Sequence, residues 1–530
     1  MFTRLKTEFI FVLAGIVLLA VLFIAQHQAL ERSGGTNYAG AIGVPLDDVY
    51  IHCRYAENLL AGHGYSFNSP QQVTADTSPL WVVLIAAGGL LTHHLDVVAV
   101  ILSSLAWLML APGVFRVARD VFSLGKYPSL MAGIFMLLNG RALGLAASGM
   151  ETSLAILLAL VSAEAHIRSR DRMQPRVREA IMLGLGILTR PELMLLALVC
   201  FIDWFVLLAK RRIQFAALYS YITAFAPFAV TYIVLPLAIE GSLSYHSSIV
   251  QGFGLRFPPD FYYIVRSFSI IFEQYFYIVL FAIPLIGLAT RDSQDTISDR
   301  RRTLFHRLGL PRLTPRTAVL AAFFISLPVL QSVVAPQYRH FGRYVFVLIP
   351  FACLWVAAFA RNHRRQQATT VSTARDKLVG GLVLLVLLAI ASPASFKWIG
   401  NYADSVSNIN DQHLAVAAWV DANCTAKDVI AADDVGALGF VAKRNVIDLT
   451  GLVSPAMYPL QRDQRDVWKA ARAQGANIFI IYTRLNPSFY EYAKDSLELV
   501  RSFTVRPPLV SSADTTMRIF RLKGGSYATR

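Results

Sequence analysis

Long apolar runs separated by short polar segments fill the chain from its N-terminus to about residue 395. A helix needs roughly 20 apolar residues to cross the hydrocarbon core of a bilayer, and most of these runs approach that length. No small-residue cleavage pattern follows the first run, so we expect a retained helix and not a signal peptide. The pattern predicts a mainly α-helical, multi-pass membrane protein with about eleven spans. The expected spans are residues 8–28, 97–115, 128–147, 150–165, 179–190, 192–209, 213–237, 265–289, 317–335, 341–360 and 378–395.

A shorter apolar run, residues 79–91, decides the topology. If this run crossed the membrane, every later basic loop would lie outside, against the positive-inside rule. At about 13 residues it is also short for a span. We therefore expect a re-entrant or interfacial helix that closes a first external loop, 29–96, with the N-terminus in the cytoplasm and the C-terminus outside.

From about residue 396 the apolar runs shorten and alternate with polar positions, which is typical of a soluble domain. The expected elements are strands at 429–432, 445–449 and 477–482 and helices at 410–422 and 463–474. Strands that alternate with helices favour an α/β arrangement. The sequence thus predicts a transmembrane domain over 1–395 and an extracytoplasmic α/β domain over 396–530.

The 530-residue chain carries 49 Lys and Arg against 34 Asp and Glu, a formal net charge of +15. Such an excess is found in nucleic-acid-binding proteins. Here, however, the basic residues lie in short loops between apolar runs, where they indicate the cytoplasmic side of a membrane. The basic loops are 116–126, 168–178, 210–212, 291–316 and 361–377. The charge reports orientation, and we expect membrane lipid but no nucleic acid as a partner.

Two adjacent carboxylates, Asp47 and Asp48, follow the first apolar run. Uncompensated carboxylates near a membrane are costly and usually serve function. A single Asp could cap the helix that follows, but two exceed what a cap requires. That helix is expected to be amphipathic, to lie along the membrane and to stop at Gly62, with Arg54 and Glu57 on its polar face.

Three further polar clusters fall on the same side of the membrane under this topology. Each cluster alone could complement a helix dipole or reach lipid phosphate. Because all converge on the face that carries the acidic pair, a shared site is the stronger interpretation. The clusters are 148–152 with Glu151, 189–192 with Arg190 and Glu192, and 337–344 with Arg339, His340, Arg343 and Tyr344. His246, in the long loop 238–264, either contacts substrate or is solvated.

Motifs throughout the chain carry a family resemblance. They are Leu46-Asp47-Asp48, 54–59, Gly62-His63-Gly64, 67–68, 77–81, 148–152, 188–192, 342–344, 434–440 and 448–452. In these motifs the sequence resembles the GT-C class of polyprenyl-phosphate-dependent integral membrane glycosyltransferases, and within it a bacterial branch related to the terminal arabinofuranosyltransferases. Residues 73–77 and 244–248 differ from the pattern common among such relatives.

The resemblance implies a set of site residues. Asp47 is the expected general base, and Asp48 is expected to orient the acceptor or to help bind a divalent cation. Arg190, Arg339 and Arg343 are expected at the donor phosphate, because guanidinium offers paired donors to phosphate oxygens. The other expected substrate-binding residues are Arg54, Tyr55, Glu57, Glu151, Glu192, His246, His340 and Tyr344. No cofactor other than that divalent cation is expected.

The resemblance also implies substrates and a location. The donor would be a polyprenyl-phosphate sugar, with arabinofuranose or another pentose as candidates, and the acceptor a cell-envelope glycan or glycolipid. Transfer would occur at the outer face of the bacterial inner membrane, with inversion at the anomeric carbon. The alternative is a transporter or flippase of lipid-linked sugars, which would also have many spans and intramembrane charge.

Overall fold

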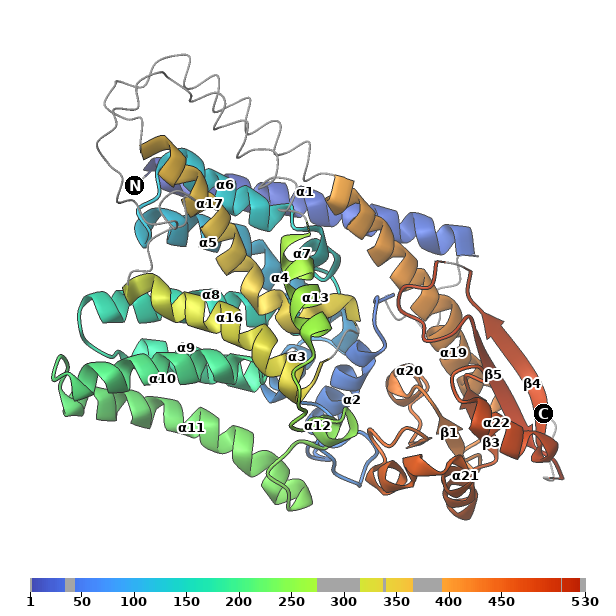
Figure 1. The fold of residues 1–530 in the computed structure, drawn as a ribbon. Coiled ribbons are helices and arrows are strands. Elements are labelled where there is room, and N and C mark those ends of the chain that lie inside the picture. The colour runs from blue at the N-terminus through green and yellow to red at the C-terminus, as the bar shows by residue number, and fades with distance from the viewer. Residues whose placement is uncertain are drawn as a thin grey trace.

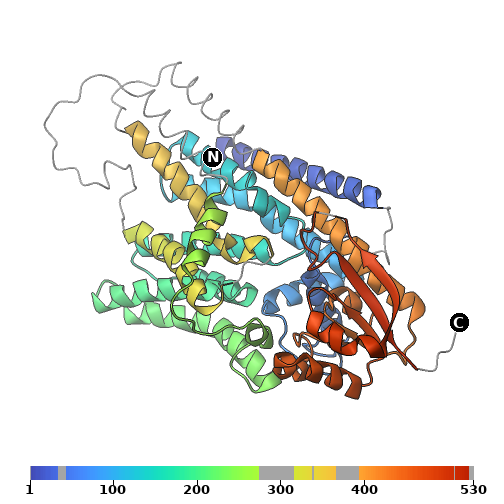
Figure 2. The same ribbon diagram turned by 45° about the vertical axis from the view of Figure 1, so that its right-hand side comes forward.

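A computed structural model describes residues 2–33, 43–273, 315–336, 340–365, 393–506 and 508–524. These residues form a bundle of helices with a small sheet domain, made by the C-terminal part of the chain, at one end (Figure 1). A second view shows the sheet domain beside the segment that contains α2 (Asp48–Leu60) (Figure 2). The first loop and the last domain, far apart in the sequence, are therefore neighbours in the fold.

Four helices of the described chain are long and apolar enough to cross a membrane. They are α1 (Phe2–Ser33), α4 (Leu95–Leu108) continued by α5 (Leu110–Asp120), α11 (Phe215–Glu240) and α16 (Pro315–Val334). Only 11% of the most apolar stretch of α11 is buried inside the protein. The rest of that stretch is surface that a bilayer covers, and the chain is a multi-pass membrane protein.

The other expected spans correspond to helices that are shorter or less apolar, or extend beyond the described residues. These helices are α8 (Thr152–Asp171), α9 (Val177–Thr189), α10 (Leu193–Ala209), α13 (Phe261–Phe272) and α17 (Ile349–Arg365), which follows the 3₁₀ helix η2 (His340–Leu348). Most of the expected span 378–395 and the later part of 265–289 lie outside the described residues. The total of about eleven spans stays a prediction.

One expected helix is broken. Residues 128–147 were expected to form a single span, but α6 (Lys126–Leu137) ends and a short α7 (Gly140–Gly144) begins anew. The cause is Asn139, whose side chain caps the new helix by accepting a hydrogen bond from the Ala142 amide at 2.9 Å. An Asn side chain in this role competes with the helical backbone and starts a fresh turn.

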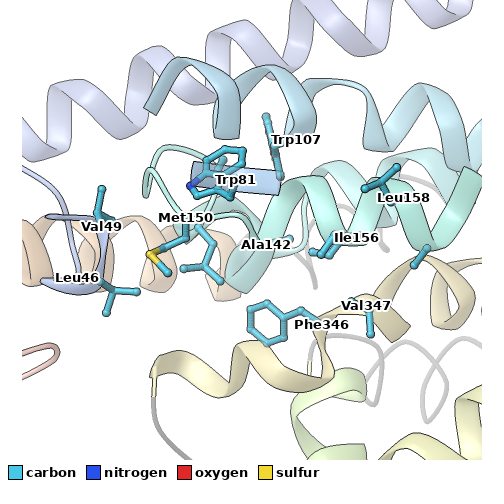
Figure 3. Packing of buried hydrophobic residues seen from close by; sticks show 14 of the residues in the cluster. Leu46, Val49, Trp81, Trp107, Ala142, Met150, Ile156, Leu158, Phe346 and Val347 are labelled. Carbon is cyan, nitrogen blue, oxygen red and sulfur yellow. The ribbon is translucent and has the colours of Figure 1, made fainter. Parts of the chain in front are cut away.

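The first loop is built on two helices, as the sequence predicted. After α2 the backbone turns at Gly62, where φ is +78°, and α3 (Pro79–Gly89) follows. Trp81 of α3 donates a hydrogen bond from Nε1 to the Gly149 carbonyl at 3.1 Å. Its ring belongs to the same buried apolar cluster as Val49 and Met150 (Figure 3). The start of α2 is thereby fixed against the segment that leads into α8.

The C-terminal domain has a five-stranded sheet in the order β2-β1-β3-β5-β4. The strands are β1 (Ile430–Ala432), β2 (Val446–Asp448), β3 (Ile478–Ile481), β4 (Leu497–Thr504) and β5 (Thr516–Leu522). The first three are parallel and match the predicted strands, whereas β4 and β5 pair antiparallel and were not predicted. The sheet is thus mixed, with an antiparallel extension at one edge.

Helices surround this sheet. They are η3 (Asn410–Leu414), α19 (Ala415–Asn423), α20 (Gly436–Phe440), η4 (Pro455–Arg462), α21 (Gln464–Ala473), α22 (Pro487–Ala493) and η5 (Lys494–Ser496). A helix over 393–409 runs without interruption into η3 and α19. The predicted helices 410–422 and 463–474 coincide with η3–α19 and α21.

A buried polar group joins four helices of the bundle. Glu179 of α9 accepts three hydrogen bonds at Oε1, from His166 Nδ1 at 2.7 Å, Trp204 Nε1 at 2.9 Å and the Tyr221 hydroxyl at 2.9 Å. These donors come from α8, α10 and α11. Because all four side chains are buried, their mutual bonds satisfy groups that lipid could not.

Candidate active site

A cavity lies where α2 and the loop before α3 meet the starts of α8 and α10, α12 (His246–Val250) and η2. Its empty space, including the open mouth, is ≈ 680 Å³. The structure places on this cavity six residues that the sequence analysis selected from four separate segments: Asp48, Glu151, Arg190, Glu192, Arg343 and Tyr344. Leu452 of the C-terminal domain also lines it.

The two adjacent carboxylates point in different directions. Asp48 lines the cavity and accepts a hydrogen bond at Oδ2 from Arg343 Nη2 at 2.8 Å. Asp47, which precedes α2, does not line the cavity. Its oxygens accept from the backbone amides of Gly436 at 2.8 Å and Ala437 at 3.0 Å, and His413 Nδ1 lies 3.2 Å from Oδ1. Asp47 is therefore bound to the C-terminal domain.

Arg343 lines the cavity and is a buried cation with unused hydrogen-bonding groups. Its side chain is only 9% exposed, and it forms an ion pair with Asp48. Nε and Nη1 have no hydrogen-bond partner among the described residues. Buried donors normally have partners because leaving them unpaired costs about 1–3 kcal/mol each. Two such donors on one positively charged group suit an anionic ligand that offers several acceptor oxygens.

Arg190, by contrast, is saturated by protein carboxylates. Nη1 donates to Glu151 at 2.6 Å, while Nη2 and Nε donate to Glu192 at 2.6 and 3.1 Å. Each of these residues lines the cavity. These ion pairs shape the wall of the cavity, and they leave less of the Arg190 guanidinium for a donor phosphate than Arg343 offers.

His52 is a cavity residue that the sequence analysis missed. Nδ1 lies 2.5 Å from Asp76 Oδ2 and Nε2 lies 3.3 Å from Glu151 Oε2. Burial alone would lower the histidine pKa, but the charges of Asp76 and Glu151 raise it to about 10. His52 is then an imidazolium at neutral pH. The available signal was spacing, because residues four apart share a helix face and His52 follows Asp48 by four.

Three expected substrate-binding residues, Arg54, Tyr55 and Glu57, lie away from the cavity and hold the first loop in place. Arg54 donates to the Phe67 carbonyl at 3.2 Å and to Glu57 at 2.8 Å. The Tyr55 hydroxyl donates to the Val73 carbonyl at 2.7 Å. Their partners are protein groups, so the structure gives them a bracing position instead of a cavity position.

His246 and Glu57 connect the bundle to the C-terminal domain. His246 donates from Nε2 to the Gly451 carbonyl at 2.7 Å. Glu57 forms an ion pair with Lys443. Neither residue lines the cavity.

The segment around η2 is partly described. Arg339 lies outside the described residues, and so does the side chain of His340. The ring of Tyr344 lies 5.2 Å from the Arg190 guanidinium and 5.6 Å from that of Arg343. A ring shared by two guanidinium groups fixes both of them at the wall of the cavity.

The acidic pair does not fit a divalent cation. The Asp47 oxygens face three donors of the C-terminal domain, and the Asp48 carboxylate faces a guanidinium. Within the described ranges, one group of metal-ligating residue types has its ligand atoms within 4.8 Å of one another, namely His166, Glu179 and Cys200. That group lies in the helix bundle and not on the cavity.

Comparison with known proteins places the fold. Residues 407–520 match the model of a domain of unknown function, DUF8728. No curated protein matches the chain. The structure of ArnT from Cupriavidus metallidurans bound to undecaprenyl phosphate has a TM-score of 0.53 at 13% identity, over 95% of this chain and 97% of ArnT. The apo structure of that protein gives 0.55 at 12% identity over the same shares.

The chain has the GT-C fold. A mycobacterial arabinofuranosyltransferase, AftD, has a TM-score of 0.48 at 13% identity, over 96% of this chain and 40% of AftD. At these identities the likeness concerns the fold.

Proposed function

We propose that the protein is a membrane glycosyltransferase that moves a sugar from a polyprenyl-phosphate donor to a hydroxyl acceptor. The supporting observation is the pair formed by Asp48 and Arg343 on the cavity, where a carboxylate and a buried guanidinium with two unpaired donors lie side by side. Transfer from a phosphate donor requires one group of each kind, a base for the acceptor and a cation for the leaving group. A relative in fold was solved with undecaprenyl phosphate bound.

The mechanism follows from this pair. Asp48 accepts the proton of the acceptor hydroxyl while that oxygen attacks the anomeric carbon. The bond from this carbon to the phosphate oxygen breaks, and its electron pair leaves with polyprenyl phosphate. Arg343 stabilises the departing anion through Nε and Nη1, and Asp48 then releases its proton to water. One displacement inverts the anomeric carbon.

This assignment moves the base from Asp47 to Asp48. Three donors of the C-terminal domain occupy the Asp47 carboxylate, and this residue does not line the cavity. Asp48 lies on the cavity, where an acceptor can reach it. The donor sugar in this proposal is arabinofuranose or another pentose, and the acceptor is a cell-envelope glycan or glycolipid at the outer face of the inner membrane.

The leaving-group assignment is tested with undecaprenyl phosphate as the probe. Arg343→Ala should weaken its binding at least about tenfold, because a hydrogen bond to a charged group contributes roughly 1.5–3 kcal/mol. Arg343→Lys should recover only part, since an ammonium lacks the planar fork. Arg116→Ala is the matched control, because Arg116 pairs with Glu164 and does not line the cavity. Equal affinity in wild type and Arg343→Ala would refute the assignment.

The base is tested on the same preparations. Wild type is first given a panel of polyprenyl-phosphate pentoses and hexoses, and release of free polyprenyl phosphate is measured. Asp48→Asn should then lose at least about a hundredfold in turnover, the usual size of a general-base effect, while binding undecaprenyl phosphate normally. Glu31→Gln is the control, because Glu31 is an exposed carboxylate of α1 that pairs with His27 and lies off the cavity. Near-normal turnover by Asp48→Asn would remove Asp48 from the mechanism.

A further inference from the structure

The C-terminal domain reaches the active-site helix through Asp47. Asp47 is the residue that precedes α2, and Asp48 is the first residue of that helix. The Asp47 carboxylate receives the amides of Gly436 and Ala437, both at the start of α20, and lies beside His413 of η3. Its side chain is only 11% exposed. All three donors belong to the C-terminal domain, so the position of Asp47 depends on where that domain sits.

Hydrogen bonding fixes the charge of His413. The Tyr482 hydroxyl lies 3.0 Å from Gln412 Oε1 and 3.1 Å from His413 Nε2. Gln412 donates from its own nitrogen to the Asp514 carbonyl at 3.3 Å, which leaves Oε1 as an acceptor. The hydroxyl also bonds the Asp434 carboxylate, so its single proton goes to Gln412 or to Asp434, and Nε2 donates to the hydroxyl oxygen.

The second ring nitrogen of His413, Nδ1, is also a hydrogen-bond donor. Nδ1 of His413 faces the Asp47 carboxylate, which can only accept. With both nitrogens acting as donors, the ring is an imidazolium. The charged groups around it are Asp47 and, at 3.9 Å from Nε2, Asp434. Although burial lowers the histidine pKa, these carboxylates raise it above its usual value. His413 and Asp47 thus form a buried ion pair between the two parts of the chain.

Two glycines allow this close approach. A Cβ built on Gly436 would lie 2.4 Å from both the backbone oxygen and Oδ2 of Asp47. A Cβ on Gly439, one turn later, would lie 2.3 Å from the Phe67 ring. No side chain fits at either position without displacing the first loop. Helix α20 therefore packs backbone to backbone against the start of α2.

Further hydrogen bonds join the first loop to the C-terminal domain and limit rotation of one against the other. Asn68 donates to the Val446 carbonyl at 2.8 Å and accepts from the Val446 amide at 3.0 Å. Asn445 donates to the Ser69 carbonyl at 2.8 Å. The loop before α3 is thus bonded along the edge strand β2.

We propose that the C-terminal domain is a positioning part of the active site: His413 and the amides of α20 hold Asp47, and through the first turn of α2 they aim Asp48 at the cavity. This gives a role to the region that matches a domain of unknown function. The role rests on the proposed function only in naming Asp48 as the base. The residues involved are positioning residues and do not touch substrate.

Hydrogen exchange of the backbone amides over 44–52 tests the geometry without any substrate. His413→Ala and Gly436→Ala should increase exchange there, because the first removes the cation and the second inserts a methyl group where Asp47 lies. Gly475→Ala is the matched control. Gly475 has φ of +87° and its nearest neighbour for a Cβ is Val429 at 3.8 Å. The control therefore strains the same domain without touching Asp47.

The effect on catalysis is tested by measuring the turnover of the same variants. Turnover by His413→Ala should fall by about a hundredfold, since misplacing a reacting group by 1 Å can cost that much, while undecaprenyl phosphate should bind as in wild type. The turnover of His413→Gln should lie between those of wild type and His413→Ala, because the Gln amide keeps one donor for Asp47. Gly475→Ala should keep wild-type exchange over 44–52 and wild-type turnover.

The possible results distinguish failure of the positioning role from failure of the proposed function. Exchange and turnover unchanged in His413→Ala would overturn the positioning role while leaving Asp48 as the base. An equal loss in Gly475→Ala would also overturn it, since general destabilisation of the domain would then explain the effect. If wild type does not bind undecaprenyl phosphate, the proposed function fails, and the exchange measurement still decides whether the C-terminal domain fixes the start of α2.

Discussion

Asp47 and Asp48 are identical in chemistry and differ in direction. Successive residues of a helix project about 100° apart, so one carboxylate faces the cavity and the other faces the C-terminal domain. The sequence could select the pair but could not rank its members, because the ranking depends on a domain nearly four hundred residues later, 389 positions from Asp47 to Gly436. The same holds for Arg190 and Arg343, whose partners decide which guanidinium keeps unpaired donors.

The His413–Asp47 ion pair gives a prediction for pH. The pKa of His413 is raised in the folded protein, so the pair stabilises fully below the unfolded value of about 6.5. That stabilisation is lost as the pH rises through the folded value. The difference in melting temperature between wild type and His413→Gln should therefore be largest near pH 6 and should shrink in alkaline buffer. Thermal unfolding in detergent across this range measures it, and a difference that grows with pH would contradict the ion pair.

At the scale of elements, the sequence predicted what apolar periodicity can encode. The strands β1, β2 and β3 are short buried runs, and their positions were predicted from that burial. In contrast, nearly every residue of β4 is exposed, so its sequence lacks the alternation of a half-buried strand. The break between α6 and α7 was missed because a single capping residue, Asn139, overrides an otherwise continuous apolar run. Such local competition is invisible to a hydropathy pattern.

The four-helix contact around Glu179 gives a prediction at this scale. Glu179→Gln keeps the shape but removes the charge that His166 and two other donors share. Breaking a buried pair by removing one partner costs about 3–5 kcal/mol. The melting temperature should fall clearly, whereas Glu31→Gln, in an exposed pair with His27, should leave it nearly unchanged. Equal melting temperatures for wild type and Glu179→Gln would mean that the contact is not what joins these helices.

For the whole molecule, the residues and motifs of the sequence indicated the GT-C fold that the structure has. Four helices of the described residues are long and apolar enough to cross the membrane. How the other apolar helices lie in the membrane depends on which loops are cytoplasmic. The basic loops predict that α3 does not cross and that the C-terminal domain lies outside the cytoplasm. Hydropathy alone could not predict this topology, because an apolar run as short as α3 is compatible with several positions in a bilayer.

Reporter fusions test that orientation. A reporter active only in the cytoplasm should be inactive when fused after residue 400 and also after residue 92, and active after residue 122, within a basic loop. The fusion after residue 122 is the internal control for expression and membrane insertion. An active reporter after residue 400 would place the C-terminal domain in the cytoplasm and reverse the predicted topology.

The long separation between Asp47 and Gly436 also has a consequence for biosynthesis. The two residues are 389 positions apart, and a ribosome adds roughly 5–20 residues per second. The first loop thus emerges on the order of 20 to 80 s before its partner exists. During that interval the nascent chain has membrane-inserted helices in which Asp47 still lacks its partners. Quality control can therefore discard a product that is truncated before residue 436, because the contact that holds Asp47 has not yet formed.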